Sequence, residues 1–105
     1  MPGPGLLKIV RHKDRAAIEK TKQDRCEVCG APAHGDPHHI VTVGAGGPDM
    51  EENLVQLCWN CHYGRIPAGK LNKAELFKLV ARRMRITAEE AIKRVEQKMG
   101  RGIKL

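Results

Sequence analysis

Four cysteines in two pairs, CEVC at residues 26–29 and CWNC at residues 58–61, decide the fold of this chain. Each pair has the C-x2-C spacing with which two thiolates bind one metal ion, and two pairs complete a tetrahedral zinc site. The 28 residues between the pairs must then fold back to bring the cysteines together. A redox pair or four unrelated buried thiols explain the spacing less well, and disulfides are rare in a reducing cytosol. We therefore predict structural zinc bound by Cys26, Cys29, Cys58 and Cys61.

A zinc site also compensates for a small hydrophobic core. The chain has 105 residues, the size of one domain, and residues 1–105 are interpreted as a single domain. Its aromatic residues are Trp59, Tyr63 and Phe77, whereas large aromatic side chains usually supply much of a small core. Structural zinc contributes on the order of 10 kcal/mol to the folding of isolated finger peptides. We expect Trp59 to pack beside the zinc rather than to stack on a base.

The positive charge of the chain lies in its two flanks. Residues 1–25 carry seven Lys and Arg against three Asp and Glu, and residues 72–105 carry ten against four. Residues 26–71 carry two basic residues against five acidic ones, so the net charge of +7 belongs to the flanks. Such a charge favours a polyanionic partner, and we expect the flanks to hold its phosphate backbone.

Short elements surround the cysteines. Residues 14–23 have helix-forming side chains and predict a short helix. Residues 38–43, HHIVTV, are rich in β-branched side chains and predict a strand. Residues 44–49, GAGGPD, are expected to form a flexible loop. Residues 53–61 then lead into a short helix that ends near Gly64.

The C-terminal third of the chain is predicted to be a helical hairpin. Asn72 with Glu75, and Thr87 with Glu90, are capping pairs that begin two helices. Apolar residues follow each pair at helical spacing, and Gly100 favours the end of the second helix. The predicted fold class is therefore α+β, with a small zinc-stapled core, an N-terminal helix and a C-terminal helical hairpin.

Hydropathy favours a cytoplasmic protein. No stretch approaches the roughly 18 apolar residues that span a bilayer. Residues 6–10, LLKIV, are interrupted by Lys8, and this run is too short for the apolar region of a signal peptide.

Three histidines lie close to the cysteine pairs in the sequence. His38 and His39 are adjacent, and neighbouring side chains of a strand point to opposite faces. One of them can therefore face a metal ion while the other faces elsewhere. His62 directly follows the last cysteine, and imidazole is the commonest protein ligand of transition metals. A second cation, bound by imidazoles, fits this pattern.

These residues resemble a known family. The first C-x2-C pair, the HHI motif at residues 38–40 and the sequence NLVQLCWNCH at residues 53–62 are similar, in order and spacing, to the motifs of the HNH endonucleases. The resemblance covers residues 26–65. It implies a ββα-metal core and a nuclease that hydrolyses DNA with the help of a divalent metal ion.

The resemblance also implies a role for each motif residue. His39 takes the position of the general base that activates water, and His38 and His62 take those of the ligands of the catalytic divalent ion. Asn53 takes the position of a residue that holds the loop and helps to orient His39. Arg65 stands where the family often has Lys, three residues after His62, and is expected to contact the scissile phosphate.

The chemistry agrees with these roles. An imidazole has an ordinary pKa of about 6.5 and is a competent base at neutral pH. Two imidazoles suit Mn²⁺ or another first-row ion better than Mg²⁺, which prefers oxygen ligands. One active site cuts one strand per event, so we expect nicks, and the resemblance implies 5′-phosphate and 3′-hydroxyl ends.

Two functions from different classes remain open. The first is a metal-dependent DNA endonuclease, and the second is a non-catalytic zinc module that binds nucleic acid. A binding module needs the cysteines alone, so His38, His39, Asn53 and His62 together favour the nuclease. Double-stranded DNA is the favoured partner, RNA stays open as a substrate, and both a monomer and a homodimer are compatible with the sequence.

Overall fold

The computed structural model describes residues 11–105. Residues 1–10, which include the LLKIV run and the first part of the predicted N-terminal flank, lie outside the described residues. Within residues 11–105 no helix has the length and apolar character needed to cross a membrane.

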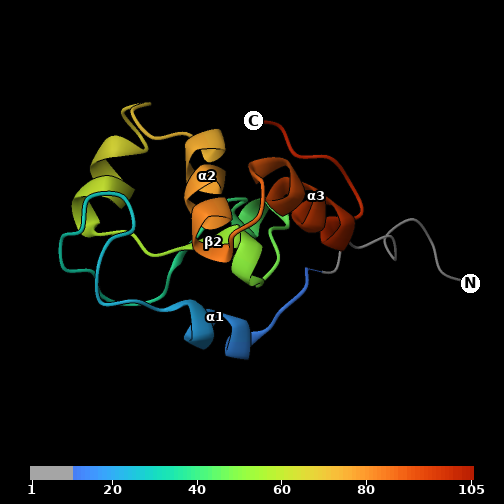
Figure 1. The fold of residues 1–105 in the computed structure, drawn as a ribbon, viewed down its shortest axis with the longest axis horizontal. Coiled ribbons are helices and arrows are strands. Elements are labelled where there is room, and N and C mark those ends of the chain that lie inside the picture. The colour runs from blue at the N-terminus through green and yellow to red at the C-terminus, as the bar shows by residue number, and fades with distance from the viewer. Residues whose placement is uncertain (1–10) are drawn as a thin grey trace, which may run out of the picture.

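Figure 1 shows α2 and α3 side by side, with α1 on the other side of β2. In chain order the elements are helix α1 (Arg15–Thr21), strand β1 (His38–His39), the 3-10 turns η2 (Val43–Ala45) and η3 (Glu51–Asn53), strand β2 (Leu54–Val55), the π-helical turn η4 (Cys61–Arg65), and helices α2 (Lys73–Met84) and α3 (Ala88–Met99).

The helices begin and end where capping residues predict. The side chain of Asp14 accepts hydrogen bonds from the first backbone N–H groups of α1. Asn72 caps α2 and Thr87 caps α3 in the same way, each accepting from the N–H three residues later. Gly100 ends α3 in the left-handed conformation, with a φ of 76°. The predicted N-terminal helix and C-terminal hairpin are therefore confirmed.

The sheet is shorter than the sequence predicts. Strands β1 and β2 pair antiparallel, with His38 opposite Val55 and His39 opposite Leu54. The predicted strand over residues 38–43 is wrong beyond His39, because Asn53 takes the backbone groups that would continue the ladder. Its side-chain Oδ1 accepts from the N–H of Val41 and its Nδ2 donates to the Val41 carbonyl. The chain leaves the sheet at that point.

The glycine-rich loop over residues 44–49 is packed, and the expectation of a flexible loop is wrong for its second half. Gly47, Pro48 and Asp49 are all buried. The N–H of Gly47 donates to the Thr42 carbonyl, and a Cβ at this position would lie 1.7 Å from the Val41 oxygen. The glycine therefore allows a close approach of two backbone segments that no other residue allows.

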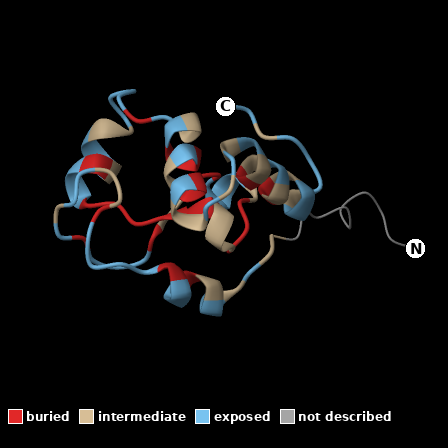
Figure 2. Cartoon of the chain, in the orientation of Figure 1, coloured by how far each residue is buried: buried red, intermediate tan, exposed pale blue. Residues whose placement is uncertain are grey.

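The core lies where α2 packs over β2 and α3 packs against α2 and η3. Phe77 and Val80 of α2, Val95 of α3, and both residues of β2 are fully buried. Figure 2 shows the buried stretches turned toward the centre of the molecule and the outer helix faces exposed. The predicted α+β class is confirmed, with β1, β2 and the η4 turn as a ββα unit and the hairpin closing one side of it.

The basic flanks fold against the acidic middle of the chain, so the expectation of separate basic arms needs correction. Every acidic residue within residues 26–71 forms an ion pair with a basic residue of a flank. The pairs are Glu27–Arg83, Asp36–Arg15, Asp36–Lys22, Asp49–Arg11, Glu51–Lys20 and Glu52–Arg94. Part of the positive charge therefore stabilises the fold. Lys78, Arg82 and Arg85 are exposed, and they form no ion pair within the described residues.

Candidate active site

The four cysteines meet at one point. Their sulfur atoms all lie within 4.8 Å of one another, and Cys29 Sγ is 3.6 Å from Cys58 Sγ. Two thiolates about 2.3 Å from one tetrahedral zinc lie roughly 3.8 Å apart, so the cluster has the dimensions of a four-cysteine zinc site. Within residues 11–105 it is the one set of three or more potential metal ligands that converge in this way.

The four thiols lie close enough together to affect one another's ionisation. Burial, together with the sulfur atoms of Cys58, Cys26 and Cys29, raises the pKa of Cys61 to about 12. Burial opposes ionisation of Cys26 as well, but the backbone N–H groups of Cys29, Cys58 and Val28 lower its pKa to about 7. Four thiolates this close repel one another unless a cation neutralises them. The donor set therefore fits zinc.

Two histidine rings face each other beside this cluster. His38 from β1 and His62 from the η4 turn bring Nδ1 and Nε2 within 3.1 Å, with ring centroids 4.6 Å apart. Two nitrogen ligands about 2.1 Å from one ion, at roughly a right angle, have nearly this separation. Burial, with the nearby His62 and His39, lowers the pKa of His38 to about 4, and burial also lowers the pKa of His62. Both imidazoles are neutral at neutral pH, the state that binds metal ions.

The η4 turn connects the two groups of ligands. The N–H of His62 donates to the Cys58 carbonyl, and the N–H of Ile66 donates to the Cys61 carbonyl five residues earlier. This widened π-helical spacing is uncommon and frequently marks functional sites. Because Cys61 and His62 are adjacent, a zinc ion that fixes the cysteine also fixes the position of the histidine.

His39 points away from this pair and contacts Asp49. Its Nε2 lies 2.8 Å from Asp49 Oδ1, at the end of the glycine-rich loop. Arg11 also pairs with Oδ1 of Asp49, and the N–H of Asp14 donates to Oδ2 at 2.9 Å. Burial opposes ionisation of Asp49, but the Asp14 N–H, His39 and Arg11 together lower its pKa to about 2.

Asp49 is the site residue that sequence reasoning missed. An aspartate in a G-G-P-D sequence is typical of a turn, and nothing nearby in the chain marks it as the partner of a histidine ten residues earlier. The sequence does contain one signal, the glycine pair Gly46 and Gly47. These residues allow a tight loop, and the tight loop brings Asp49 next to His39.

Asn53 acts on the loop rather than on His39 directly. It is fully buried, and its Nδ2 donates to the carbonyls of Val41 and Pro48 while its Oδ1 accepts from the Val41 N–H. These three bonds join the two ends of the loop that carries Asp49. Asn53 therefore holds the loop, and Asp49 makes the hydrogen bond to His39.

Two other predicted residues lie around the η4 turn. Arg65 is half-buried, with Nη1 3.9 Å from Cys61 Sγ, so its guanidinium lies against the cysteine cluster. The side chain of Trp59 is 77% exposed, so the prediction that it packs beside the zinc is wrong. The helical turn that directs Cys58 and Cys61 inward places the two residues between them, Trp59 and Asn60, on the outer surface.

Comparisons with known proteins agree with this geometry. Residues 26–65 match the family model described as HNH endonuclease. The Type IV methyl-directed restriction enzyme EcoKMcrA of Escherichia coli (strain K12) is 39% identical over 57 residues, which cover 46% of this chain and 21% of that enzyme. The chain thus matches about a fifth of the length of this relative. No solved structure matches the chain. The segment that matches the HNH endonuclease family model, residues 26–65, contains the cysteine cluster together with His39, Asn53 and His62.

Proposed function

We propose that this chain is a metal-dependent DNA endonuclease that hydrolyses phosphodiester bonds. The observation that carries the proposal is the pairing of His38 with His62 at 3.1 Å, next to a third histidine held by a carboxylate. Such a site combines a pair of open metal ligands with a base. The name of the similar protein, a restriction enzyme, supports DNA as the substrate. The net charge of the chain, +7, supports a polyanionic substrate, whether DNA or RNA.

His39 is the proposed general base. Asp49 is ionised at neutral pH, so its carboxylate accepts a hydrogen bond from Nε2–H of His39, which keeps the ring proton on Nε2 and leaves Nδ1 unprotonated. Nδ1 can then take a proton from the attacking water, and the imidazolium that forms is stabilised by the Asp49 carboxylate. Asn53 supports this arrangement through the loop, because it holds the segment that positions Asp49.

His38 and His62 are the proposed ligands of the catalytic divalent ion. A divalent ion bound there would stabilise the negative charge that develops on the phosphate and on the leaving 3′ oxygen. Two imidazoles favour Mn²⁺ or another first-row ion over Mg²⁺. Two protein ligands leave the remaining coordination positions to water and substrate, as a catalytic site requires. Arg65 is the proposed phosphate contact, because a guanidinium has five N–H donors and one sulfur contact leaves the others available.

A chain with one such site cuts one strand per event. We therefore propose that the protein nicks double-stranded DNA and leaves 5′-phosphate and 3′-hydroxyl ends. Dimerisation or a second encounter is needed for a double-strand break.

Conversion of supercoiled plasmid tests the proposal. Zinc-loaded wild-type protein with Mn²⁺ should give open circles before linear DNA, faster than with Mg²⁺, and DNA ligase should reseal the nicks. The variant His39→Ala should be slower by about 100- to 10,000-fold, the usual contribution of a general base.

Three results would contradict parts of the proposal. Equal rates for His39→Ala and wild type remove His39 from the mechanism, and equal or better rates in Mg²⁺ remove the preference for Mn²⁺. Binding of DNA without cleavage under any divalent ion would support a non-catalytic zinc module instead, and cleavage of RNA alone would change the substrate.

A further inference from the structure

An exposed aromatic pair lies beside the histidine ligands. Trp59 and Tyr63 are 77% and 56% exposed, among the few large apolar side chains on the described surface. Their ring centroids are 4.2 Å apart, and the Tyr63 ring is also 4.2 Å from the His62 ring. The rings therefore form a continuous series, from the histidine pair outward to the indole of Trp59.

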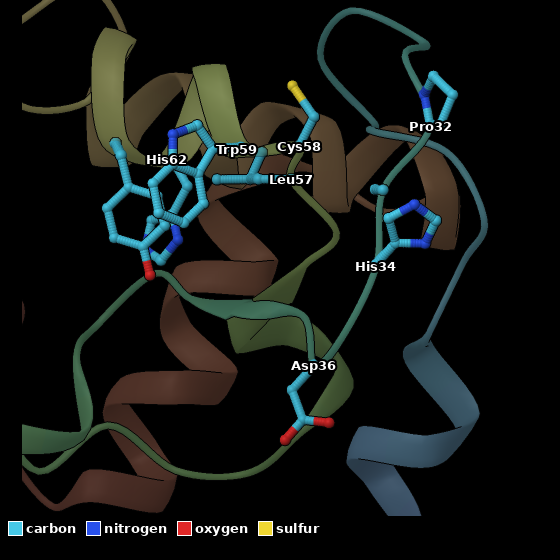
Figure 3. Close-up of a pocket in the computed structure, with 9 residues that line it drawn as sticks. Pro32, His34, Asp36, Leu57, Cys58, Trp59 and His62 are labelled. Atoms are coloured by element: carbon cyan, nitrogen blue, oxygen red, sulfur yellow. The ribbon is translucent and has the colours of Figure 1, made fainter.

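The pair borders a pocket of about 430 Å³. Trp59, Tyr63 and His62 line it from the η4 side, and His34 and Asp36 line it from the loop between the first cysteine pair and β1. In the view of Figure 3, Trp59 and His62 lie on one side of the pocket, with His34 across from them and Asp36 at its lower edge. The pocket thus offers flat apolar faces on one side and polar groups on the other.

This arrangement suits a planar ligand with polar edges. A nucleobase has two apolar faces that stack on aromatic rings and an edge that forms hydrogen bonds, and stacking does not depend on which base is present. Inside a duplex both faces of a base are covered by its neighbours, so only a base displaced from the stack can use such a surface.

We propose that Trp59 and Tyr63 bind an unstacked base next to the phosphate held at His38 and His62, so that the protein prefers DNA in which a base is displaced. The proposal rests on the proposed nuclease function for the identity of the substrate. It assigns substrate selection to Trp59 and Tyr63 and phosphate hydrolysis to the histidines beside them.

Binding measurements test the proposal without cleavage. Trp59 is the single tryptophan of the chain, so its fluorescence reports directly on stacking. The zinc-loaded variant His39→Ala, with no further metal added, is titrated with a duplex that contains an unpaired-base bulge and with the fully paired duplex of the same sequence. The bulged duplex should quench Trp59 and bind about tenfold more tightly than the paired one.

Substitutions in the same background locate the effect. Trp59→Ala and Tyr63→Ala, measured by the anisotropy of labelled DNA, should each remove most of the preference for the bulge and leave binding of the paired duplex unchanged. Val43→Ala is the matched control, because Val43 is also an exposed apolar residue, 50% exposed, and it is not among the residues that line this pocket. It should keep the full preference.

Several outcomes would overturn the inference. These are equal quenching by both duplexes, an unchanged preference in Trp59→Ala, or an equal loss of affinity for both duplexes. Concentration-dependent self-association that Trp59→Ala abolishes would assign the surface to a second copy of the chain. If wild type cuts no nucleic acid while Trp59 still selects the bulge, the nuclease function fails and the stacking surface stands.

Discussion

His39 Nε2 lies 2.8 Å from Oδ1 of Asp49, a carboxylate that arrives ten residues later at the end of a buried loop. The contact engages Nε2 and not Nδ1, the nitrogen that is proposed to act as the base. Arg11 and the N–H of Asp14 hold the carboxylate in turn, so the ring is oriented by a fixed group. This relation links the fold of the glycine-rich loop to the proposed chemistry.

Replacement of Asp49 should therefore slow cleavage. We expect Asp49→Asn to lower kcat by about 10- to 100-fold with little change in KM, because the amide no longer favours a proton on Nε2 of His39. Asp36→Asn is the matched control, since Asp36 is a carboxylate whose partners are Arg15 and Lys22. Initial rates of plasmid nicking at several DNA concentrations measure both constants. A full-speed Asp49→Asn protein would show that His39 needs no carboxylate.

The close approach at Gly47 predicts a second sensitive position. A Cβ there would lie 1.7 Å from the Val41 oxygen, so Gly47→Ala must displace the loop that carries Asp49. We expect a loss of about 1–3 kcal/mol in the free energy of unfolding, as for other overpacked sites, together with slower cleavage. At Gly44 a Cβ meets nothing within 4 Å, so Gly44→Ala should be neutral. Chemical unfolding at constant zinc separates the two variants, and equal stability would argue against a tight loop.

Features with local causes could be predicted from the sequence. The cysteine spacing predicts the cluster, because each C-x2-C pair lies on a short turn that directs its two sulfur atoms toward the same metal ion. The capping residues Asn72 and Thr87 predict where α2 and α3 begin, because their side chains bond to N–H groups three residues away. The roles of His38, His39 and His62 come from resemblance and stay predictions until a substrate is tested.

Features that depend on the path of the backbone could not be predicted in this way. The strand after His39 ends because Asn53, twelve residues after Val41, takes the Val41 backbone groups. Asp49 reaches His39 only because the loop closes at Gly47. None of these relations is visible as a pattern within a few residues.

Arg83 should be important for stability, although Arg82 next to it in the helix is an exposed surface residue. Its Nη1 is 2.5 Å from Glu27 Oε1, and its Nη2 donates to the carbonyls of Glu51 and Leu54. The variant Arg83→Gln leaves a largely buried carboxylate without its cation, and should cost about 3 kcal/mol in the free energy of unfolding. Arg82→Gln is the control at an exposed position and should stay within about 0.5 kcal/mol of wild type. Thermal unfolding of both zinc-loaded variants decides whether this ion pair stabilises the fold.

The two proposed metal sites should be separable by mutation. We expect one tightly held zinc per chain, lost in Cys61→Ser together with the folded structure, because Cys61 is fully buried in the cluster. His62→Ala should keep this zinc and the fold but lose cleavage, since the ring faces His38 rather than the sulfurs. Elemental analysis and circular dichroism of both variants test the assignment. Loss of zinc from His62→Ala would mean that the two sites are one.

Binding of DNA should depend on the basic residues that the fold leaves free. Lys78 and Arg82 are exposed on α2 and form no ion pair within the described residues, whereas Arg83 of the same helix is bound to Glu27. The double variant Lys78→Gln/Arg82→Gln should weaken DNA binding and reduce the slope of log K against log salt by about 0.9 for each phosphate that the protein no longer neutralises. Its rate at saturating DNA should stay close to that of wild type, because neither residue contacts the histidines. The control is Lys22→Gln, whose side chain pairs with Glu19 and Asp36 and should leave the slope unchanged. If the double variant keeps the affinity and the salt slope of wild type, the phosphate backbone is held by another part of the surface.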